Sequence, residues 1–406
     1  MKLRLLDLLI CPVCTAGLTC HAFERQSEPV ASAPGTPACA GHCARHNTAV
    51  ATLTAPPDCR ACYGDDIVSG VLGCTGCGRL YPILAGVPRL IRDAVTAYPD
   101  FFNRHYETLA GLAAPMAGIA PPPPLPTDRR SNDSFSLQWQ NHGDQDKTWF
   151  KDDLALRRDE FAQSLNVEPA ALAGRLVLDA GCGNGRLTAA VAGYGAEIVG
   201  MDLSGSVERA QANRPRAAGE RAPFVHFFQG NVLEPPLARE AFDFVHSSGV
   251  IHHTPDPEGA LHALLSRARR HGKLYIQLYR KRETWVGLPN QLLRMITTRL
   301  PVRLLYRLCW LAVPLHTALV MVVARLRGET SPLATASHGE RALSLFDNFS
   351  PRYQFRYTAE QVDRLFRAAG LDDVRDVTLA NEARHMVAFV GTRGDGDQRP
   401  ITIPAP

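Results

Sequence analysis

The sequence predicts an α/β protein whose main domain is a parallel sheet covered by helices on both faces, with a small metal-binding module before it. Three observations lead to this prediction. Strand and helix patterns alternate from Arg175 onward, which is typical of a parallel sheet with crossover helices. A short apolar run, residues 176–180, ends in glycines at the alternate positions 181, 183 and 185. Nine of the eleven cysteines lie within the first 77 residues, several of them as Cys-x-x-Cys pairs.

Composition indicates a globular protein that can bury a large core. The chain has 406 residues, 45% of them hydrophobic and 21% charged, which suits two or three domains. A net charge of +4 does not by itself indicate nucleic acid binding, so we do not expect nucleic acid as a partner. Asp7 divides the apolar run of residues 1–10, which does not fit a signal peptide, and we therefore expect a cytoplasmic protein.

Two cysteine pairs predict a structural zinc site in the N-terminal module. Cys11-Pro12-Val13-Cys14 and Cys74-Thr75-Gly76-Cys77 each place two thiolates on one side of a tight turn. In a reducing compartment such clustering favours zinc over disulfides. Because four thiolates close the coordination sphere, Cys11, Cys14, Cys74 and Cys77 are expected to hold a structural metal ion rather than a catalytic one.

The segment between the two pairs is longer than a zinc ribbon needs and carries further thiols. It contains Cys39, Cys43, Cys59 and Cys62. These four either form a second zinc site or are incidental thiols of a loop rich in proline, alanine and serine. The sequence leaves both interpretations open.

The residues around the outer cysteines resemble the Trm112-like zinc-ribbon family. Residues 5–14 and 71–90 carry the resemblance. Members of this family commonly act as activating partners of methyltransferases, so the resemblance implies that a protein partner can bind through the ribbon. We place this domain at residues 1–92, and the cysteine-rich insertion departs from the family's compact form.

A proline-rich linker is expected at residues 93–134, with Pro121–Pro126 extended as polyproline. The aromatic segment Ser134–Trp139 follows it and precedes a charged helix predicted at Trp149–Leu165. This segment either folds over a cofactor pocket or packs at the edge of the domain. In the first case Trp139 is the pocket residue.

The strand series continues beyond the glycine turn. The second strand, Ala196–Asp202, ends in a carboxylate about 20 residues after the glycines, where dinucleotide-type folds bind a ribose diol. A helix is expected from Pro255 to about Arg270. Further strands are expected at Phe224–Gly230, Phe242–His253, Gly272–Tyr279, Asp372–Leu379 and His385–Gly391.

Over residues 135–394 this series resembles the class I S-adenosylmethionine-dependent methyltransferases, especially their small-molecule type. The resemblance implies a Rossmann-like seven-stranded sheet with an antiparallel last strand, and S-adenosyl-L-methionine as cofactor. It places the glycine turn beneath the methionine part, Asp202 at the ribose, Leu203 on the adenine, and Asn231 where the family usually has Asp. The expected cofactor-binding residues are Trp139, Asp179, Gly181, Gly183, Asn184, Gly185, Asp202, Leu203, Asn231, Val232 and Ser247. An NAD-binding Rossmann domain is the competing interpretation, which the Gly-x-Gly-x-Gly spacing disfavours.

Two histidines are the candidate catalytic residues. His252 and His253 follow the fourth strand, at the sheet edge where ligands bind in open α/β folds. Either could deprotonate a hydroxyl or phenol. The alternative is that one of them bonds the loop while the other packs on the cofactor. His246, within the strand, is expected to be a core histidine.

The residues after the fourth strand also limit the acceptor. Methyltransferases of planar amino nitrogens usually show Asn/Asp-Pro-Pro-Tyr/Phe there, whereas this chain has His246-Ser247-Ser248-Gly249. Oxygen, carbon and aliphatic amines remain as acceptors, and we favour O- or C-methylation.

A basic, apolar insertion at residues 280–350 is expected to form a helical cap. Residues 280–328 hold nine lysines and arginines against the single acid Glu283, and leucines recur at helical spacing. We prefer helices over the active site, with peripheral membrane contact through 285–327, to a transmembrane segment. A cap with an ordinary buried face is the alternative. An apolar cap rimmed by arginines favours an acceptor that is apolar, anionic or both.

The sequence therefore predicts a methyltransferase with a fused zinc ribbon that acts on a small-molecule or lipid-like acceptor. The alternative is a zinc-ribbon adaptor that binds RNA or a protein partner, with the methyltransferase fold as a scaffold or as the modifier of that macromolecule. Residues 395–406 are expected to be a disordered tail.

Overall fold

The computed structural model describes residues 1–395 apart from several short segments. The segments left out are 29, 31–38, 40–41, 44, 47, 55–57, 113–128, 143–153, 282–283, 327 and 329–335. The expected polyproline stretch and all but the first residue of the expected tail lie outside the described residues.

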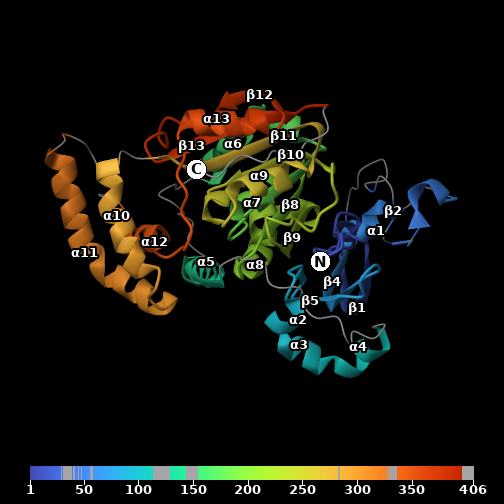
Figure 1. Cartoon of the computed structure of the whole chain (residues 1–406). Helices are drawn as coiled ribbons and strands as arrows, with labels where there is room; N and C mark the ends of the chain where they lie inside the picture. The colour runs from blue at the N-terminus through green and yellow to red at the C-terminus, as the bar shows by residue number, and fades with distance from the viewer. Residues whose placement is uncertain are drawn as a thin grey trace.

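A small antiparallel sheet forms the N-terminal domain, in the order β1-β4-β5-β6 (Figure 1). Its strands are β1 (Leu18–Ser27), β4 (Asp65–Cys74), β5 (Leu80–Leu84) and β6 (Val87–Pro88). The insertion contributes the hairpin β2 (His42–Cys43) and β3 (Thr48–Ala49) and the helix α1 (Cys59–Gly64). The helices α2 (Ala94–Ala97), α3 (Pro99–Arg104) and α4 (Tyr106–Leu112) follow, so the described part of the expected linker begins as short helices.

The main domain is built on a seven-stranded sheet in the order β12-β13-β11-β10-β7-β8-β9. The five strands β7 to β11 pair in parallel, and β13 lies antiparallel between β11 and β12. The strands are β7 (Leu176–Ala180), β8 (Glu197–Asp202), β9 (Val225–Gln229), β10 (Phe242–Ser248), β11 (Ala268–Tyr279), β12 (Leu371–Asp376) and β13 (Met386–Arg393). This arrangement confirms the predicted fold class, including its antiparallel last strand.

Helices cover the sheet and connect its parallel strands. They are α6 (Leu154–Ser164), α7 (Arg186–Val191), α8 (Ser206–Ala218), α9 (Pro257–Leu265) and α13 (Ala359–Ala368). A capping box forms at the start of α13 between Thr358 and Gln361. The predicted end of α9 near Arg270 is wrong, because Ala268 already pairs with Phe242 as the start of β11.

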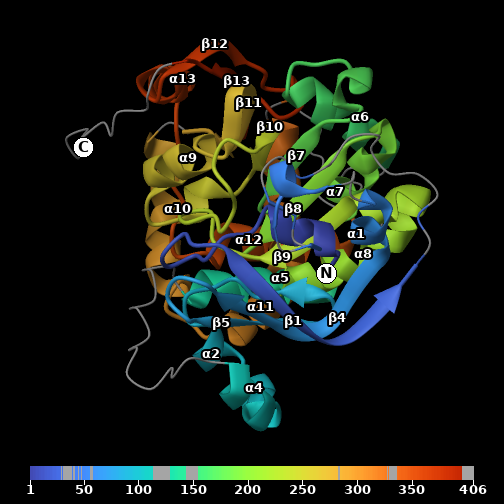
Figure 2. The same cartoon turned by 90° about the vertical axis from the view of Figure 1, so that its right-hand side faces the viewer.

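Four helices lie on the side of the main domain away from the N-terminal domain (Figures 1 and 2). They are α5 (Arg129–His142), α10 (Thr284–Thr297), α11 (Val302–Leu326) and α12 (His338–Phe349). The α12 helix opens with a capping box between Ser337 and Glu340. Residues 347–349 form the last turn of α12.

The N-terminal domain packs directly on the β9 edge of the large sheet. Leu90 N donates to Gln229 O at 2.9 Å, and the backbones of Arg89 and Gln229 form an isolated parallel β-bridge. Leu9 and Ile83 belong to the same buried cluster as Met201 and Phe228 of the main domain. The two domains therefore share a hydrophobic cluster, and one face of the ribbon contacts the main domain of its own chain.

A buried carboxylate in β8 ties the two domains together electrostatically. Glu197 accepts hydrogen bonds from Arg4 Nε at 3.0 Å, Tyr63 Oη at 2.9 Å and His226 Nε2 at 3.1 Å. Burial alone would raise the pKa of Glu197, but the charge of Arg4 and the bond from His226 lower it to about 2. The carboxylate is therefore charged in the folded protein and depends on its partners from the N-terminal domain.

We predict that Glu197→Gln destabilises the whole protein by about 3–5 kcal/mol, because it leaves Arg4 buried without its main counter-charge. The control is Glu240→Gln. It removes a half-exposed ion pair with Arg393, which contributes about 1 kcal/mol or less to the free energy of unfolding. Denaturant unfolding measures both. The folded pKa of Glu197 lies below its ordinary value of 4.5, so its stabilisation is complete above pH 4.5 and disappears as the pH falls towards 2. Equal stability of the two variants would contradict a shared, charge-stabilised interface.

Candidate functional site

The glycine turn after β7 requires glycine at all three alternate positions. Gly181, Gly183 and Gly185 have φ values of 91°, 54° and 68°, in the left-handed region. A Cβ at Gly185 would lie 2.5 Å from the Cβ of Ala210 in α8. The turn therefore lets α8 approach closely at the carboxyl end of β7, where ligands bind in open α/β folds.

Asp179, at the end of β7, is held inside the protein beneath this turn. Its carboxylate accepts from Thr188 Oγ1 at 2.5 Å and from His246 Nδ1 at 3.1 Å. His246 is stacked between the rings of Phe161 and Tyr275. The prediction that His246 is a core histidine is confirmed. Asp179 holds the start of the turn in place through its hydrogen bonds to α7 and β10.

Asp202 closes the turn from β8. Its Oδ2 accepts from Gly183 N at 3.0 Å, and its Oδ1 accepts from Ser204 N at 2.9 Å and Ser204 Oγ at 2.7 Å. Burial raises the pKa of Asp202 although these bonds oppose the shift. A carboxylate has about four lone-pair sites, so three bonds leave room for a ribose hydroxyl. The half-buried Leu203 follows directly.

The other expected cofactor residues differ in what their polar groups do. Asn231 Oδ1 accepts from Leu233 N at 3.0 Å, and Asn184 Oδ1 accepts from Arg186 N at 3.3 Å. Val232 is buried beside Asn231. The hydroxyl of Ser247 donates to Ala180 O at 2.9 Å inside the sheet, so in this structure it joins β10 to β7 rather than facing a ligand.

Trp139 lies against the glycine turn, as the pocket interpretation requires. A Cβ on Gly183 would be 2.9 Å from the indole ring. The segment that carries it is the helix α5, and Ser136 of α5 accepts a hydrogen bond from Gly205 N at 2.9 Å. Gln138, almost fully buried on the same helix, has an Oε1 atom without a partner among the described residues. Helix α5 therefore brings aromatic and polar groups over the cofactor side of the sheet.

The histidine pair lies in a short 3-10 turn, Ile251–His253, beyond β10. His253 Nδ1 donates to Tyr353 O at 2.9 Å, which leaves its Nε2 unprotonated when the ring is neutral. His252 is fully buried, and neither of its ring nitrogens has a hydrogen-bond partner among the described residues. A buried imidazole without partners is costly unless a ligand or water bonds it, so His252 is a candidate binding position.

Two further residues complete this cluster, and sequence reasoning missed both. The ring of Tyr279, at the end of β11, lies 4.1 Å from the ring of His252, and its hydroxyl donates to Asp347 Oδ2 at 2.6 Å. Tyr279 could have been found as a polar residue at the carboxyl end of a parallel strand. No sequence signal identified Asp347, because it reaches the site only through the packing of α12.

The electrostatics of the cluster keep both histidines neutral. Burial lowers the pKa of His252 well below 6.5, and the neighbouring His253 and Arg356 lower it further. Burial also lowers the pKa of His253, against the opposing effect of Asp347. Burial and Asp347 raise the pKa of Tyr279 well above 10. A neutral imidazole at this position can accept a proton from an acceptor group.

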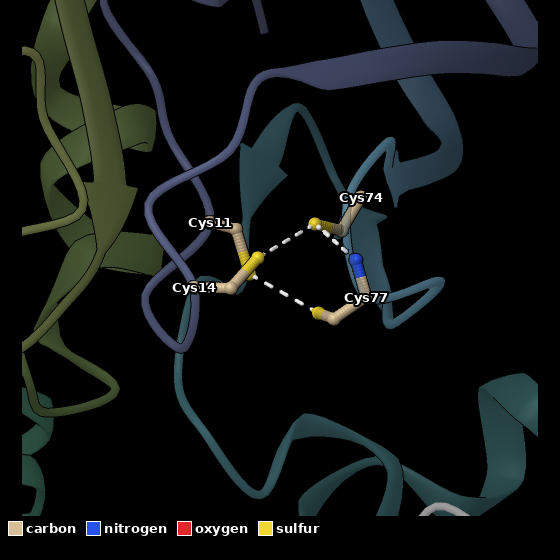
Figure 3. Close-up of side chains that lie close together, drawn as sticks. All are labelled: Cys11, Cys14, Cys74 and Cys77. Carbon is tan, nitrogen blue, oxygen red and sulfur yellow. Dashed lines mark hydrogen bonds between the residues drawn. The ribbon is translucent and has the colours of Figure 1, made fainter.

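The four outer cysteines come together in the N-terminal domain (Figure 3). Their sulfur atoms all lie within 4.8 Å of one another, with Cys14–Cys74 at 3.3 Å and Cys11–Cys77 at 3.7 Å. Bonds of about 2.3 Å from a tetrahedral zinc ion would place the sulfurs about 3.8 Å apart. Gly76 N and Cys77 N donate to Cys74 Sγ. The cluster could hold a metal ion, with backbone donors that stabilise thiolate charge.

The inner cysteines are all buried but do not form a comparable group. Cys43 Sγ lies 3.2 Å from His46 Nδ1. Among the described residues, the outer four are the group whose ligand atoms meet within 4.8 Å. A second metal site at Cys39, Cys43, Cys59 and Cys62 therefore stays a prediction.

Comparison with known families agrees with both halves of the chain. Residues 2–86 match the family described as Trm112p-like protein, and residues 178–276 match the family described as Methyltransferase domain. The second range runs from β7 to β11 and includes the glycine turn, Asp202 and the histidine pair. The first includes all four outer cysteines.

Curated relatives match this chain over part of their length. It is 27% identical over 114 residues to a ubiquinone biosynthesis O-methyltransferase of Photorhabdus laumondii, covering 28% of this chain and 47% of the relative. It is 38% identical over 108 residues to a tRNA U34 carboxymethyltransferase of Shewanella pealeana, covering 26% of this chain and 32% of the relative. The chain thus spans less than half the length of these two relatives.

Among solved structures, it is similar to the magnesium protoporphyrin IX methyltransferase of Synechocystis PCC 6803. The two are 17% identical with a TM-score of 0.38, over 65% of this chain and 98% of that one. The assignment of the fold rests on this chain's own strand order and on the two family matches. One polypeptide therefore carries a region that matches Trm112p-like proteins and a region that matches methyltransferase domains.

Proposed function

We propose that this protein transfers a methyl group from S-adenosyl-L-methionine to an acceptor bound beside His252. The observation that carries the proposal is the meeting of three groups at one edge of the sheet. The glycine turn follows β7, Asp202 ends β8, and the partnerless His252 follows β10. Val250, two residues before His252, lies against Gly181, so the histidine turn and the cofactor turn are in contact.

The glycine turn and Asp202 fit the cofactor, because the turn lies at the carboxyl end of β7, where ligands bind in open α/β folds, and Asp202 retains acceptor capacity. When bound, S-adenosyl-L-methionine supplies an electrophilic methyl group, and transfer is an in-line displacement that depends mainly on positioning and a dry site. His252 takes the proton that an acceptor hydroxyl loses as its oxygen bonds the methyl carbon. Tyr279, held by Asp347, packs on the imidazole and orients it.

We favour an oxygen or carbon acceptor on a small-molecule or lipid-like compound. A neutral buried base suits a hydroxyl or phenol, and the chain lacks the Asn/Asp-Pro-Pro-Tyr/Phe motif after β10. One curated relative is named as a ubiquinone biosynthesis O-methyltransferase, which agrees with this choice.

A second candidate acceptor is RNA, because another relative is named as a tRNA carboxymethyltransferase. Labelled S-adenosylmethionine incubated separately with a metabolite extract, a lipid extract and total RNA distinguishes the candidates. Label in the small-molecule or lipid fraction supports our proposal, and label confined to RNA favours the second candidate. The ribbon packs on the methyltransferase domain of its own chain, and the adaptor hypothesis stays an alternative.

We also propose that the outer cysteines bind one structural zinc ion. The support is the closed set of four thiols at near-tetrahedral spacing, without an open position for a substrate. Cys11 and Cys74 belong to the core that the two domains share, so the metal would stabilise the β9 edge as well as the ribbon.

We predict that the full chain binds S-adenosylmethionine and that Asp202→Ala weakens binding by about tenfold or more, because it removes a charged acceptor for the ribose. Isothermal calorimetry measures both. Asp100→Ala, at an exposed carboxylate of α3, is the control and should bind like the wild type. Failure of the wild type to bind, or unchanged binding after Asp202→Ala, would refute the cofactor assignment.

For the histidine pair, we predict that His252→Ala lowers the transfer rate by about 10²–10⁴-fold while cofactor affinity and melting temperature stay near wild type. His271→Ala, at an exposed histidine, is the control. The pKa of His252 lies well below 6.5, so the base stays unprotonated and the wild-type rate should be level from pH 8 to 6.5 and fall only at lower pH. A rate that already falls below pH 7.5, or an active His252→Ala, would argue against this base.

For the metal, elemental analysis should find one zinc per chain, and Cys74→Ser should lose it together with much of the thermal stability. Cys20→Ser removes a thiol of β1 outside both cysteine groups and should keep the zinc. Two zinc ions per chain would instead establish the second site at the inner cysteines, and none would refute the assignment.

A further inference from the structure

Helices α10 and α11 carry an apolar surface that the rest of the protein leaves uncovered. Of the eighteen large apolar side chains that are exposed among the described residues, fourteen belong to these two helices. On α11 they form what we call the apolar band: Leu304, Leu308, Leu311, Leu315, Leu319, Val322 and Leu326. Leu315 is 78% exposed and Leu326 is 83% exposed. An exposed apolar cluster of this size indicates an interaction site.

The spacing of the apolar band keeps it on one side of α11, which contains Pro314 near its middle. Its members repeat as 4-3-4 steps with a period of eleven residues, from Leu304 to Leu315 to Leu326. Eleven residues span about three turns at about 3.67 residues per turn, close to the 3.6 of an α-helix. The apolar band therefore stays on one side of the helix along its whole length, as contact with a flat surface requires.

The opposite side of α11 is held against the protein. Leu305, Cys309 and Val313 pack on Ala342 and Phe346 of α12. Arg341 of α12 also donates to Thr317 Oγ1. Because α12 is itself bonded to β11 through Asp347 and Tyr279, α11 is attached to the main domain through α12 and lies at its outer edge, away from the N-terminal domain (Figure 1).

This packing argues against a membrane-spanning helix. By length and composition α11 could cross a membrane, and only 11% of its most apolar window is buried in the protein. A span would have to separate α11 from α12, or draw α12 and its charged residues Glu340 and Arg341 into the hydrocarbon. The uncharged run from Leu308 to Ala324 is also shorter than the roughly 20 residues that a span needs.

The charged residues beside the apolar band indicate which kind of surface it binds. Residues 284–326 hold five arginines and no acidic residue. Arg303, Arg307 and Arg325 are exposed, and each precedes a member of the apolar band by one position, about 100° around the helix. They therefore line one flank of the apolar band, where a guanidinium can reach phosphates while its stem lies on apolar surface. A second copy of the same surface would bring like charges together.

We propose that α10 and α11 dock on the surface of an anionic lipid bilayer, with α11 parallel to the membrane plane. The apolar band enters the boundary between headgroups and acyl chains, and the flanking arginines bind lipid phosphates. Leu292, Leu293, Met295 and Ile296 of α10 are also exposed and extend the same contact. The docking does not depend on the proposed catalytic function.

Flotation of the full-length protein with vesicles tests the proposal. We expect binding to vesicles that contain phosphatidylglycerol, weak binding to phosphatidylcholine alone, and weaker binding at high salt. The double variant Leu315→Glu/Leu319→Glu should bind at least about tenfold less. The matched control is Tyr106→Glu, at a residue of α4 that is 72% exposed, and it should bind like the wild type. Arg303→Gln/Arg307→Gln should remove the preference for the anionic lipid.

Melting curves and S-adenosylmethionine calorimetry establish that each variant is folded, so loss of docking is separable from failure of the proposed function. Light scattering after size-exclusion chromatography tests the alternative occupant, which is a second copy of this chain. Suppose that the wild type is a dimer, that the double glutamate variant is a monomer and that neither protein binds vesicles. These results would assign the surface to a second copy and overturn the proposal. Vesicle binding unchanged in the double variant would overturn it as well.

Discussion

The rest of the structure depends on how the β9 edge of the large sheet is covered. An exposed edge strand is open to pairing with other chains, and here the N-terminal domain occupies it through Leu90 and Arg89. The hydrophobic core continues across this contact, and Glu197 holds Arg4 and Tyr63 within it. The buried cluster at this contact is therefore built by both domains, and removing residues 1–92 would expose the main-domain part of it.

Gln229 shows how this contact reaches the candidate cofactor site. Its main-chain oxygen accepts from Leu90 N, and its side-chain oxygen accepts from Tyr98 Oη at 2.5 Å. Its Nε2 atom donates to Leu203 O at 2.7 Å. Leu203 follows Asp202, so residues near the ribbon fix the position of the loop expected to hold the ribose and adenine. The N-terminal domain thus helps to hold the candidate cofactor site in place.

Much of the fold and of the cofactor side could be predicted from the sequence, because local patterns determine both. Alternating strands and helices fix the sheet, and Gly181, Gly183 and Gly185 are required by their backbone angles. The acceptor side could not be predicted as well. Asp347 reaches Tyr279 through the packing of α12 on the sheet, and no local pattern encodes that contact. Likewise the predicted helix after β10 ran too long, because the pairing of Ala268 with Phe242 overrides local helical propensity.

The two sides of the main domain have different physical roles. On one side the ribbon closes the sheet and supports the cofactor loops. On the other side α12 is shared between two surfaces: Ala342 and Phe346 pack under α11, while Asp347 orders Tyr279 beside His252. Any displacement of α11 that moves α12 must therefore move the hydrogen bond to Tyr279 as well.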